Sequence, residues 1–252
     1  MDILSFLIVC PLVFLAGFVD AIAGGGGLIS LPAYMLAGLP PHVAIGTNKL
    51  SSAVGTTVAT AQYVRKGFMV WRLAVPAILL SLLGADIGSN LTLLVPDSIF
   101  LVIMLIALPV IALYVFTHKS LSNPFEPEIT QRVWIVVLSS AFFIGMYDGF
   151  YGPGTGTFLM LLLTGLARLT TRQSAGITKA INLSSNVLSL VVFLLNGTVL
   201  LPLGLTAALF SIAGNYLGAR SFIKKGDAIA RPAIITVISI FIVKVLYELI
   251  IK

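Results

Sequence analysis

Long stretches without a charged residue dominate this chain. Ile99 to Phe116 contains no charge, and neither does the segment from Ala180 to Ala219. A helix needs about 20 apolar residues to cross a bilayer, because each residue adds about 1.5 Å. The 252 residues are 58% hydrophobic and only 10% charged, whereas soluble domains carry about 25% charged residues. The sequence therefore predicts an all-α membrane protein.

The hydrophobic segments form two halves with related sequences. Residues 17–27, GFVDAIAGGGG, recur as residues 145–156, GMYDGFYGPGTG, at a shift of 128. Residues 46–49, GTNK, recur as residues 176–179, GITK, at a shift of 130. Paired hydrophobic halves that glycine interrupts at the same place indicate the central binding site of a transporter.

Each half is predicted to contain five helical segments, of which the second is short. In the first half they are Ile3–Ile22, Leu28–Ala37, Val43–Tyr63, Leu73–Val95 and Ile99–Phe116. In the second half they are Val133–Tyr151, Thr157–Leu166, Ala175–Leu195, Leu200–Ala219 and Pro232–Ile250. We therefore expect a first transmembrane repeat over residues 1–116, a cytoplasmic linker over 117–132 and a second repeat over 133–252.

The basic residues decide whether the short segments count as crossings. If they do, the loops with Lys and Arg all lie on one face; if they do not, the Arg65–Arg72 and Arg220–Arg231 loops lie on opposite faces. The second arrangement violates the rule that cytoplasmic loops are positive. We expect five passes in each half, which makes the repeats inverted and places both termini outside.

The glycine runs predict two broken helices at membrane depth. Glycine disfavours a helix by about 1 kcal/mol per residue relative to alanine, and irregular backbone inside a membrane requires protein or a water-filled cavity around it. The amides that begin each short segment would then face an anion. Close helix packing through small residues is the alternative. The residues expected to contribute are Gly25, Gly26, Gly27, Gly154 and Thr155.

Two lysines and two aspartates are charged residues inside otherwise apolar segments. Lys49 and Lys179 match across the repeat, and a charge at the bilayer centre costs about 2.5–3.5 kcal/mol on insertion scales. We expect them to bind substrate, with snorkelling to an interface as the alternative. Asp20 and Asp148 are expected either to take up a proton or to pair with charges. The expected neutral donors beside the lysines are Thr47, Asn48, Thr178 and Asn182.

Other chemistry has little support in the sequence. A single cysteine and two histidines make a metal site improbable, and motifs for hydrolases or nucleotide binding are missing. The net charge of +6 comes from basic residues in short loops, which is a topology signal and does not indicate a nucleic-acid surface. We expect no enzyme activity and no cofactor.

The motifs GFVDAIAGGGG, AIGTNKLSS, GMYDGFYGPGTGTF, TKAINLSSN and GNYLGARSFIKKG together resemble the TauE/SafE family of sulfite-exporter-like permeases, also called toluene-sulfonate uptake permeases. The resemblance covers about Phe14 to Glu248 and is closest to a branch of probable inner-membrane transporters. It implies a secondary transporter in the bacterial cytoplasmic membrane, with sulfite, sulfonates or related sulfur-containing anions as substrates.

Residues and resemblance together lead to one hypothesis. The chain is expected to move a small sulfur oxyanion by alternating access, with the anion and the lipid bilayer as partners and a homo-oligomer as a further option. Two other interpretations stay open. The first is a transporter of a cation or neutral solute, with the aspartates as ligands. The second is a membrane subunit that transports nothing.

Overall fold

The computed structural model describes residues 3–96, 128–226, 228–230 and 232–236. The elements named within these ranges are all helices, which confirms the expected fold class of an all-α membrane protein. They are α1 (Ile3–Ala23), α2 (Gly27–Leu36), α3 (Pro41–Arg65), α4 (Trp71–Leu94), α6 (Gln131–Phe150), α7 (Thr155–Gly165), α8 (Thr171–Leu195) and α9 (Leu201–Lys225). The expected segment Ile99–Phe116 and most of Pro232–Ile250 lie outside the described residues.

Helix length and composition agree with a membrane environment. In the described part of the chain, α1, α4, α6, α8 and α9 are long and apolar enough to cross a bilayer. Helix α3 has 25 residues but is more polar than these five, because threonine, serine, asparagine and lysine occur at many of its positions. Helices α2 and α7 have 10 and 11 residues and are too short for a full crossing, which needs about 20 residues.

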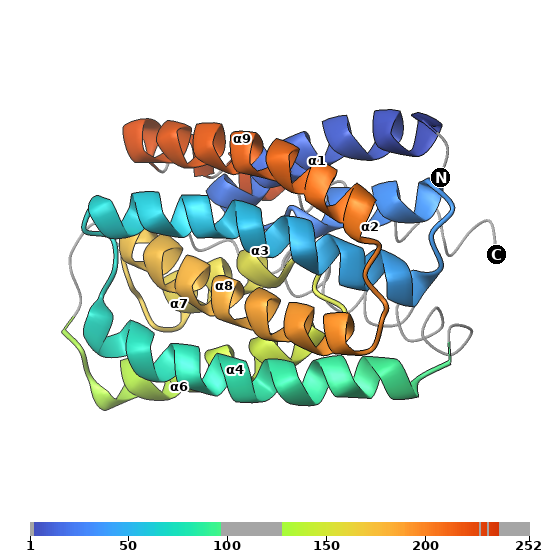
Figure 1. Ribbon diagram of the computed structural model, residues 1–252. Coiled ribbons are helices and arrows are strands. Elements are labelled where there is room, and N and C mark those ends of the chain that lie inside the picture. The colour runs from blue at the N-terminus through green and yellow to red at the C-terminus, as the bar shows by residue number, and fades with distance from the viewer. Residues whose placement is uncertain (1–2, 97–127, 227, 231, 237–252) are drawn as a thin grey trace, which may run out of the picture.

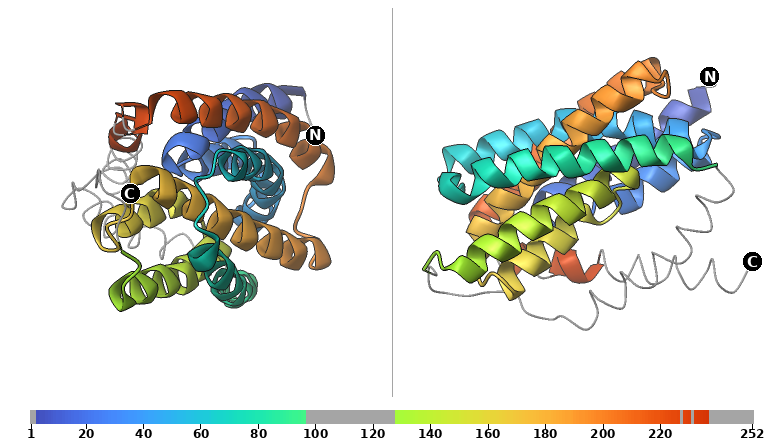
Figure 2. Two further views of the ribbon diagram at one scale, coloured as in Figure 1. Left: turned by 90° about the vertical axis from the view of Figure 1, so that its left-hand side faces the viewer. Right: turned by 90° about the horizontal axis from the view of Figure 1, so that it is seen from below.

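The helices pack in layers (Figures 1 and 2). Helices α1 and α9 form one outer layer, α4 and α6 form the other, and α3 and α8 lie between them. The outer layers are held by glycines that let helix backbones approach closely. A side chain on Gly84 or Gly88 of α4 would collide with the backbone of α6, and one on Gly214 or Gly218 of α9 would collide with that of α1.

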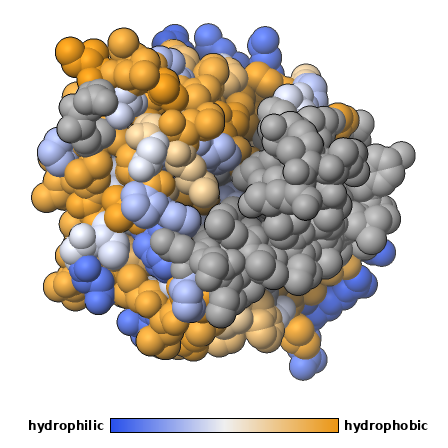
Figure 3. All heavy atoms as spheres, turned by 90° about the vertical axis from the view of Figure 1, so that its right-hand side faces the viewer, coloured by the Kyte–Doolittle hydropathy of each residue, from blue (hydrophilic) through white to orange (hydrophobic). Residues whose placement is uncertain are grey.

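The faces of the outer helices that point away from the bundle are hydrophobic. On α4, large exposed side chains recur at every fourth residue, a spacing that places them on one side of a helix. In an aqueous protein such a stripe would be a binding surface, whereas here it faces the acyl chains. The residues of this stripe are Val75, Leu79, Leu83, Ile87 and Leu91. Hydrophobic residues also dominate the coloured surface seen from the end at which α1 begins (Figure 3).

The two hairpins of the bundle open at opposite ends (Figure 1). Helix α1 begins at the right of the view and α2 leads back to that side, whereas α6 begins at the left and α7 leads back to the left. The end of α3, the starts of α4, α6 and α8 and the end of α9 lie at the left of the view. Among the described residues, lysines and arginines occur in or next to these helix ends. These residues are Arg65, Lys66, Arg72, Arg132, Arg168, Arg172, Arg220, Lys224 and Lys225.

The two glycine breaks meet in the interior. Gly24 has a φ of +74°, and a Cβ on it would collide with the backbone of Gly156, while a Cβ on Gly156 would collide with Gly24. The hydroxyl of Thr157 donates to the carbonyl of Ala23 over 2.8 Å. The end of α1 and the start of α2 therefore lie against the break before α7 and the start of α7.

Candidate functional site

Two buried ion pairs connect the halves of the chain. The ammonium of Lys49 on α3 lies 2.9 Å from Oδ2 of Asp148 on α6, and the ammonium of Lys179 on α8 lies 2.6 Å from Oδ2 of Asp20 on α1. Each lysine thus pairs with the aspartate of the other half. Both lysine side chains are only 2% exposed, so neither snorkels to an interface.

Pairing makes these four charges tolerable inside the bundle. Removing a charge from water costs several kcal/mol, and a close partner of opposite sign offsets much of that cost. Within the described residues the two pairs carry no net charge, because two carboxylates match two ammonium groups. Each aspartate thus pairs with a lysine in this conformation. The choice between charge pairing and proton uptake stays a prediction.

The Asp148 carboxylate has further partners beyond its lysine. Its Oδ1 accepts from the hydroxyl of Thr155 at 2.8 Å, and its Oδ2 accepts from the hydroxyl of Ser185 at 2.6 Å. Its side chain is 3% exposed. Three donors from α3, α7 and α8 therefore hold this carboxylate in place.

The Asp20 carboxylate accepts fewer short hydrogen bonds. Besides Lys179, its Oδ2 accepts from the hydroxyl of Thr56, at the long distance of 3.4 Å. The side chain of Asp20 is 14% exposed. The two ion pairs occupy matching positions in the repeat, yet their hydrogen bonds differ.

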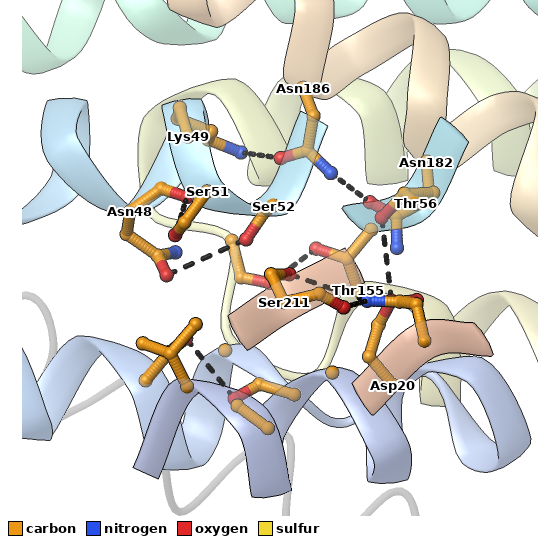
Figure 4. Close-up of a pocket in the computed structure, with 18 of the residues that line it drawn as sticks. Asp20, Asn48, Lys49, Ser51, Ser52, Thr56, Thr155, Asn182, Asn186 and Ser211 are labelled. Carbon is orange, nitrogen blue, oxygen red and sulfur yellow. Dashed lines mark hydrogen bonds between the residues drawn. The ribbon is translucent and has the colours of Figure 1, made fainter. Parts of the chain in front are cut away.

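An amide pair extends the Lys49 end of the network. Lys49 donates to Oδ1 of Asn186 over 3.0 Å, and Nδ2 of Asn186 donates to Oδ1 of Asn182 over 2.6 Å (Figure 4). Both asparagines lie on α8, four residues apart, and both are buried. A charged donor therefore connects to a chain of neutral groups that can both donate and accept.

These groups line a cavity of about 30 Å³, which is room for about two water molecules by this measure. Figure 4 shows side chains from α1, α3, α7, α8 and α9 converging on it. Its lining consists of Val13, Ala16, Gly17, Asp20, Gly24, Gly26, Gly27, Ser30, Asn48, Lys49, Ser51, Ser52, Thr56, Asp148, Gly152, Thr155, Asn182, Asn186, Ser211 and Asn215. Most of the polar side chains in this set are neutral hydroxyls and amides.

The start of α2 also opens onto this cavity. Gly26, the residue that caps α2, has no side chain with which to cap the first turn, and both Gly26 and Gly27 line the cavity. The amides at a helix start carry partial positive charge and suit an anion. On α7 the equivalent cap is Gly154, which has a φ of +84° and does not line the cavity.

The structure brings most of the expected residues together. The cavity lining includes Asp20, Gly26, Gly27, Asn48, Lys49, Asp148, Thr155 and Asn182. Lys179 is outside the lining but contacts Asp20, which is part of it. Thr47, Thr178, Gly25 and Gly154 are not part of the lining.

Thr47 and Thr178, which are outside the cavity lining, have other neighbours. Thr47 accepts a hydrogen bond from the backbone amide of Leu200 over 3.0 Å, which ties α3 to the start of α9. Thr178 is buried, and its hydroxyl has no hydrogen-bond partner among the described residues. One residue along a helix is a rotation of about 100°, so a residue next to a lining residue can face a neighbouring helix instead of the cavity.

Several lining residues were missed by the sequence analysis. Ser52 and Thr56 follow Asn48 at steps of four, and Asn186 follows Asn182 at the same step. This helical spacing of polar residues was a usable signal. Ser211 and Asn215 of α9 are also four residues apart, but their part in the site depends on how α9 packs against α1 and α3.

A metal centre has no support in the described ranges. No group of three or more His, Cys, Asp or Glu side chains lies close enough there to hold a metal ion. The chemistry available at the cavity is therefore that of two ion pairs, hydroxyls, amides and backbone amides.

Membrane-length helices around a buried polar site with paired charges define an integral membrane transporter. The chain belongs to the family described as sulfite exporter TauE/SafE, whose family model matches residues 9–245, as expected from the sequence motifs.

Curated relatives carry the same kind of name. A "Probable membrane transporter protein ORF9" of Sinorhizobium sp is 38% identical over 93% of this chain and 89% of its own length. A "Probable membrane transporter protein" of Haemophilus influenzae is 34% identical over 93% of this chain and 92% of its own. The "Probable membrane transporter protein YfcA" of Escherichia coli K12 is 31% identical over 93% and 87%. No solved structure matches the chain.

Proposed function

We propose that this protein is a secondary transporter of a small sulfur oxyanion, such as sulfite or a small sulfonate, in the bacterial cytoplasmic membrane. The observation that carries the proposal is the buried ammonium group of Lys49 at a cavity lined by hydroxyls, amides and a helix start, with the second buried ammonium group, that of Lys179, paired to the lining residue Asp20. Such donors are suited to the oxygen atoms of an oxyanion. The family description, sulfite exporter, agrees with this class of substrate.

The substrate anion competes with the aspartates for the ammonium groups. Lys49 and Lys179 each contact a carboxylate, so in this proposal an anion that binds beside them competes with that carboxylate for the ammonium group. Protonation of Asp20 or Asp148 would release a lysine, and the anion and proton together would leave the net charge of the site unchanged. The neutral groups Asn48, Asn182 and Asn186 then complete the binding of the anion.

The cavity favours small substrates. A volume of about 30 Å³ accommodates about two waters and is too small for an aromatic sulfonate in this conformation. Sulfite, or a sulfonate with a single methyl group, is closer in size. We therefore place small inorganic or methyl-sized anions ahead of aryl sulfonates.

Alternating access follows from an inverted relation between the two halves. The hairpins α1–α2 and α6–α7 open at opposite ends, and each lysine pairs with the aspartate of the other half. Both observations support a rocking motion of one half against the other around a fixed central site. In this proposal the basic end faces the cytoplasm, as the positive-inside rule requires.

Flux measurements test the proposal. Purified protein is reconstituted into liposomes, and uptake of sulfite and methanesulfonate is followed for the wild type, Lys49→Ala and Lys179→Ala. Each variant is expected to reduce flux at least about tenfold, because a buried charged donor is removed. Lys66→Ala, at an exposed loop position, is the matched control and retains flux. Flux that survives both buried substitutions contradicts the role of the lysines.

A second candidate is a cation or neutral solute. The observation that favours it is the full pairing of both lysines, which leaves the cavity without net positive charge. Competition separates the two candidates: an excess of small anions inhibits flux in the first case, and small cations or neutral analogues inhibit it in the second.

A further inference from the structure

The two ion pairs are equivalent in the repeat but not in their hydrogen bonds. Asp148 accepts from Lys49, Thr155 and Ser185, all within 2.9 Å. Asp20 accepts from Lys179 at 2.6 Å and from Thr56 only at 3.4 Å. Each hydrogen bond to a carboxylate stabilises its charged form and restrains its position. Asp148 is therefore held as a fixed carboxylate, and Asp20 is held mainly by one partner.

The sequence explains the difference at two positions. Thr155, which donates to Asp148, corresponds to Gly27 at the shift of 128, and Ser185 corresponds to Gly55 at the shift of 130. Both hydroxyl donors of the second half are thus glycines in the first half. Asp20 lacks these donors because the side chains that would supply them are absent.

A buried acceptor without a partner lies on the same side of the cavity as Asp20. Nδ2 of Asn215 donates to the backbone carbonyl of Ser211 over 3.1 Å, which fixes the orientation of the amide. Its Oδ1 has no hydrogen-bond partner among the described residues, although Asn215 is only 1% exposed. It is the Nδ2 atom of this amide, and not Oδ1, that lies beside Gly17 of α1 and Gly55 of α3.

This acceptor indicates a missing donor. A buried carbonyl without a hydrogen bond costs about 1–3 kcal/mol. A charged aspartate cannot help, because a carboxylate only accepts, whereas a protonated aspartate carries an O–H that donates. Asp20 therefore changes from a pure acceptor to a donor when it takes up a proton.

We infer that Asp20, and not Asp148, is the carboxylate that takes up one proton for each anion bound and releases its lysine to the substrate. The inference rests on the proposed function. The proton enters through the cavity and binds Asp20, which becomes a neutral acid. Lys179 keeps its charge and transfers its hydrogen bond from Asp20 to an oxygen of the anion. When the anion leaves, the proton leaves and Lys179 returns to Asp20.

The surroundings of Asp20 fit a single titrating carboxylate. Lys179 of α8 contacts it directly, and Tyr63 of α3 donates to the carbonyl of the adjacent Ala21. Lys49 and Asp148 face it across the cavity. Helices α2, α7 and α9 contribute only neutral residues to the described lining. The Lys49–Asp148 pair stays closed in this scheme and serves as a fixed part of the site.

Calorimetry measures the proton directly. Purified protein is titrated with methanesulfonate, whose charge is constant near neutral pH, and with sulfite, corrected for its own ionisation. Runs in two buffers of different ionisation enthalpy give the number of protons taken up per anion. The wild type is expected to take up about one proton, as for a single site that must be protonated to bind. Asp20→Asn binds the anion without proton uptake, and Asp148→Asn, if folded, keeps the uptake.

Two milder variants keep the test decisive if an asparagine variant fails to fold. Thr56→Val removes the hydroxyl that donates to Asp20 among the residues the structure describes, and Ser185→Ala removes one that donates to Asp148. The pH midpoint of proton-linked binding is expected to move in Thr56→Val and to stay in place in Ser185→Ala.

The outcomes separate the inference from the function on which it rests. Loss of proton uptake in Asp148→Asn with retention in Asp20→Asn overturns the assignment to Asp20. A pH midpoint of proton-linked binding that moves in Ser185→Ala and stays in place in Thr56→Val also overturns it. Anion binding by the wild type without proton uptake, or with dependence on sodium instead, overturns proton coupling but leaves the anion transporter standing. A wild type that binds neither anion contradicts the proposed function, and the inference with it.

Discussion

The ammonium of Lys179 lies 2.6 Å from a carboxylate oxygen of Asp20, which is 159 residues earlier in the chain. Lys49 makes the corresponding pair with Asp148. Each half of the protein therefore neutralises a charge that the other half buries. Separating the halves would break both ion pairs at once. Whether the pairs are closed or open therefore depends on the relative position of the two halves.

The Lys49–Asp148 pair is predicted to show strong coupling in stability. Lys49→Met or Asp148→Asn alone leaves a buried charged or polar group without its partner and is expected to cost about 3–5 kcal/mol. The double variant removes both charges and is expected to recover most of that loss. Thermal or denaturant unfolding of the purified single and double variants measures the coupling. Additive losses would mean that the pair does not interact in the folded protein.

Asn186→Leu is predicted to abolish transport without unfolding the protein. Leucine has a similar size, but it removes the acceptor for Lys49 and the donor for Asn182 and places apolar atoms in the cavity. Anion-induced thermal stabilisation and liposome flux are the measurements. Ser189→Ala, on the same helix and outside the cavity lining, is the control and retains both. Full activity in Asn186→Leu excludes the cavity as the binding site.

Gly24→Ala is predicted to prevent correct assembly of the two breaks. Gly24 combines a φ of +74° with direct contact to the backbone of Gly156, so a methyl group there collides with α7. Gly38 is the matched control, because its φ is +85° but nothing lies within 4 Å of an added Cβ. Gly38→Ala is expected to cost only the strain of the backbone conformation, about 1–2 kcal/mol. The yield of monodisperse protein is measured for Gly24→Ala and Gly38→Ala. Equal yields would contradict the contact between the two glycine breaks.

Cysteine labelling is predicted to place equivalent loops on opposite sides of the membrane. Lys66 and Asn196 are separated by the repeat shift of 130, and both are exposed. Cys10, the single native cysteine of the chain, is buried and is replaced by alanine in the background. A membrane-impermeant maleimide added to intact cells is expected to label Asn196→Cys but not Lys66→Cys, because the basic end faces inward.

Labelling at both positions, or at neither, contradicts the inverted arrangement. Permeabilised cells provide the control, since both cysteines are then accessible. The experiment tests topology independently of any transport assay.

The repeat made much of the site predictable. Because Lys49 matches Lys179 and Asp20 matches Asp148, the sequence indicated four residues that the structure brings into two contacts. The glycine runs likewise predicted the position of the breaks, since a run of glycines cannot sustain a helix. These features depend on local propensity and on the cost of charge in a membrane, both of which a sequence records.

Other parts of the site depend on packing that a sequence does not record. Thr47 was expected in the site but faces Leu200, because the rotation of α3 is set by its contacts with α8 and α9. Ser211 and Asn215 belong to the cavity only because α9 packs against α1 and α3. Local spacing cannot predict which helices become neighbours.

The sequence by itself determined that the protein lies in a membrane, that it has two related halves and that four charges are buried. Hydropathy and desolvation act on each segment regardless of its neighbours. Only the tertiary structure decided that each lysine pairs with the aspartate of the other half and that Asp148 is held more firmly than Asp20. Pairing and hydrogen bonding depend on distances of a few ångströms between segments far apart in the chain, and those distances exist only once the helices have packed.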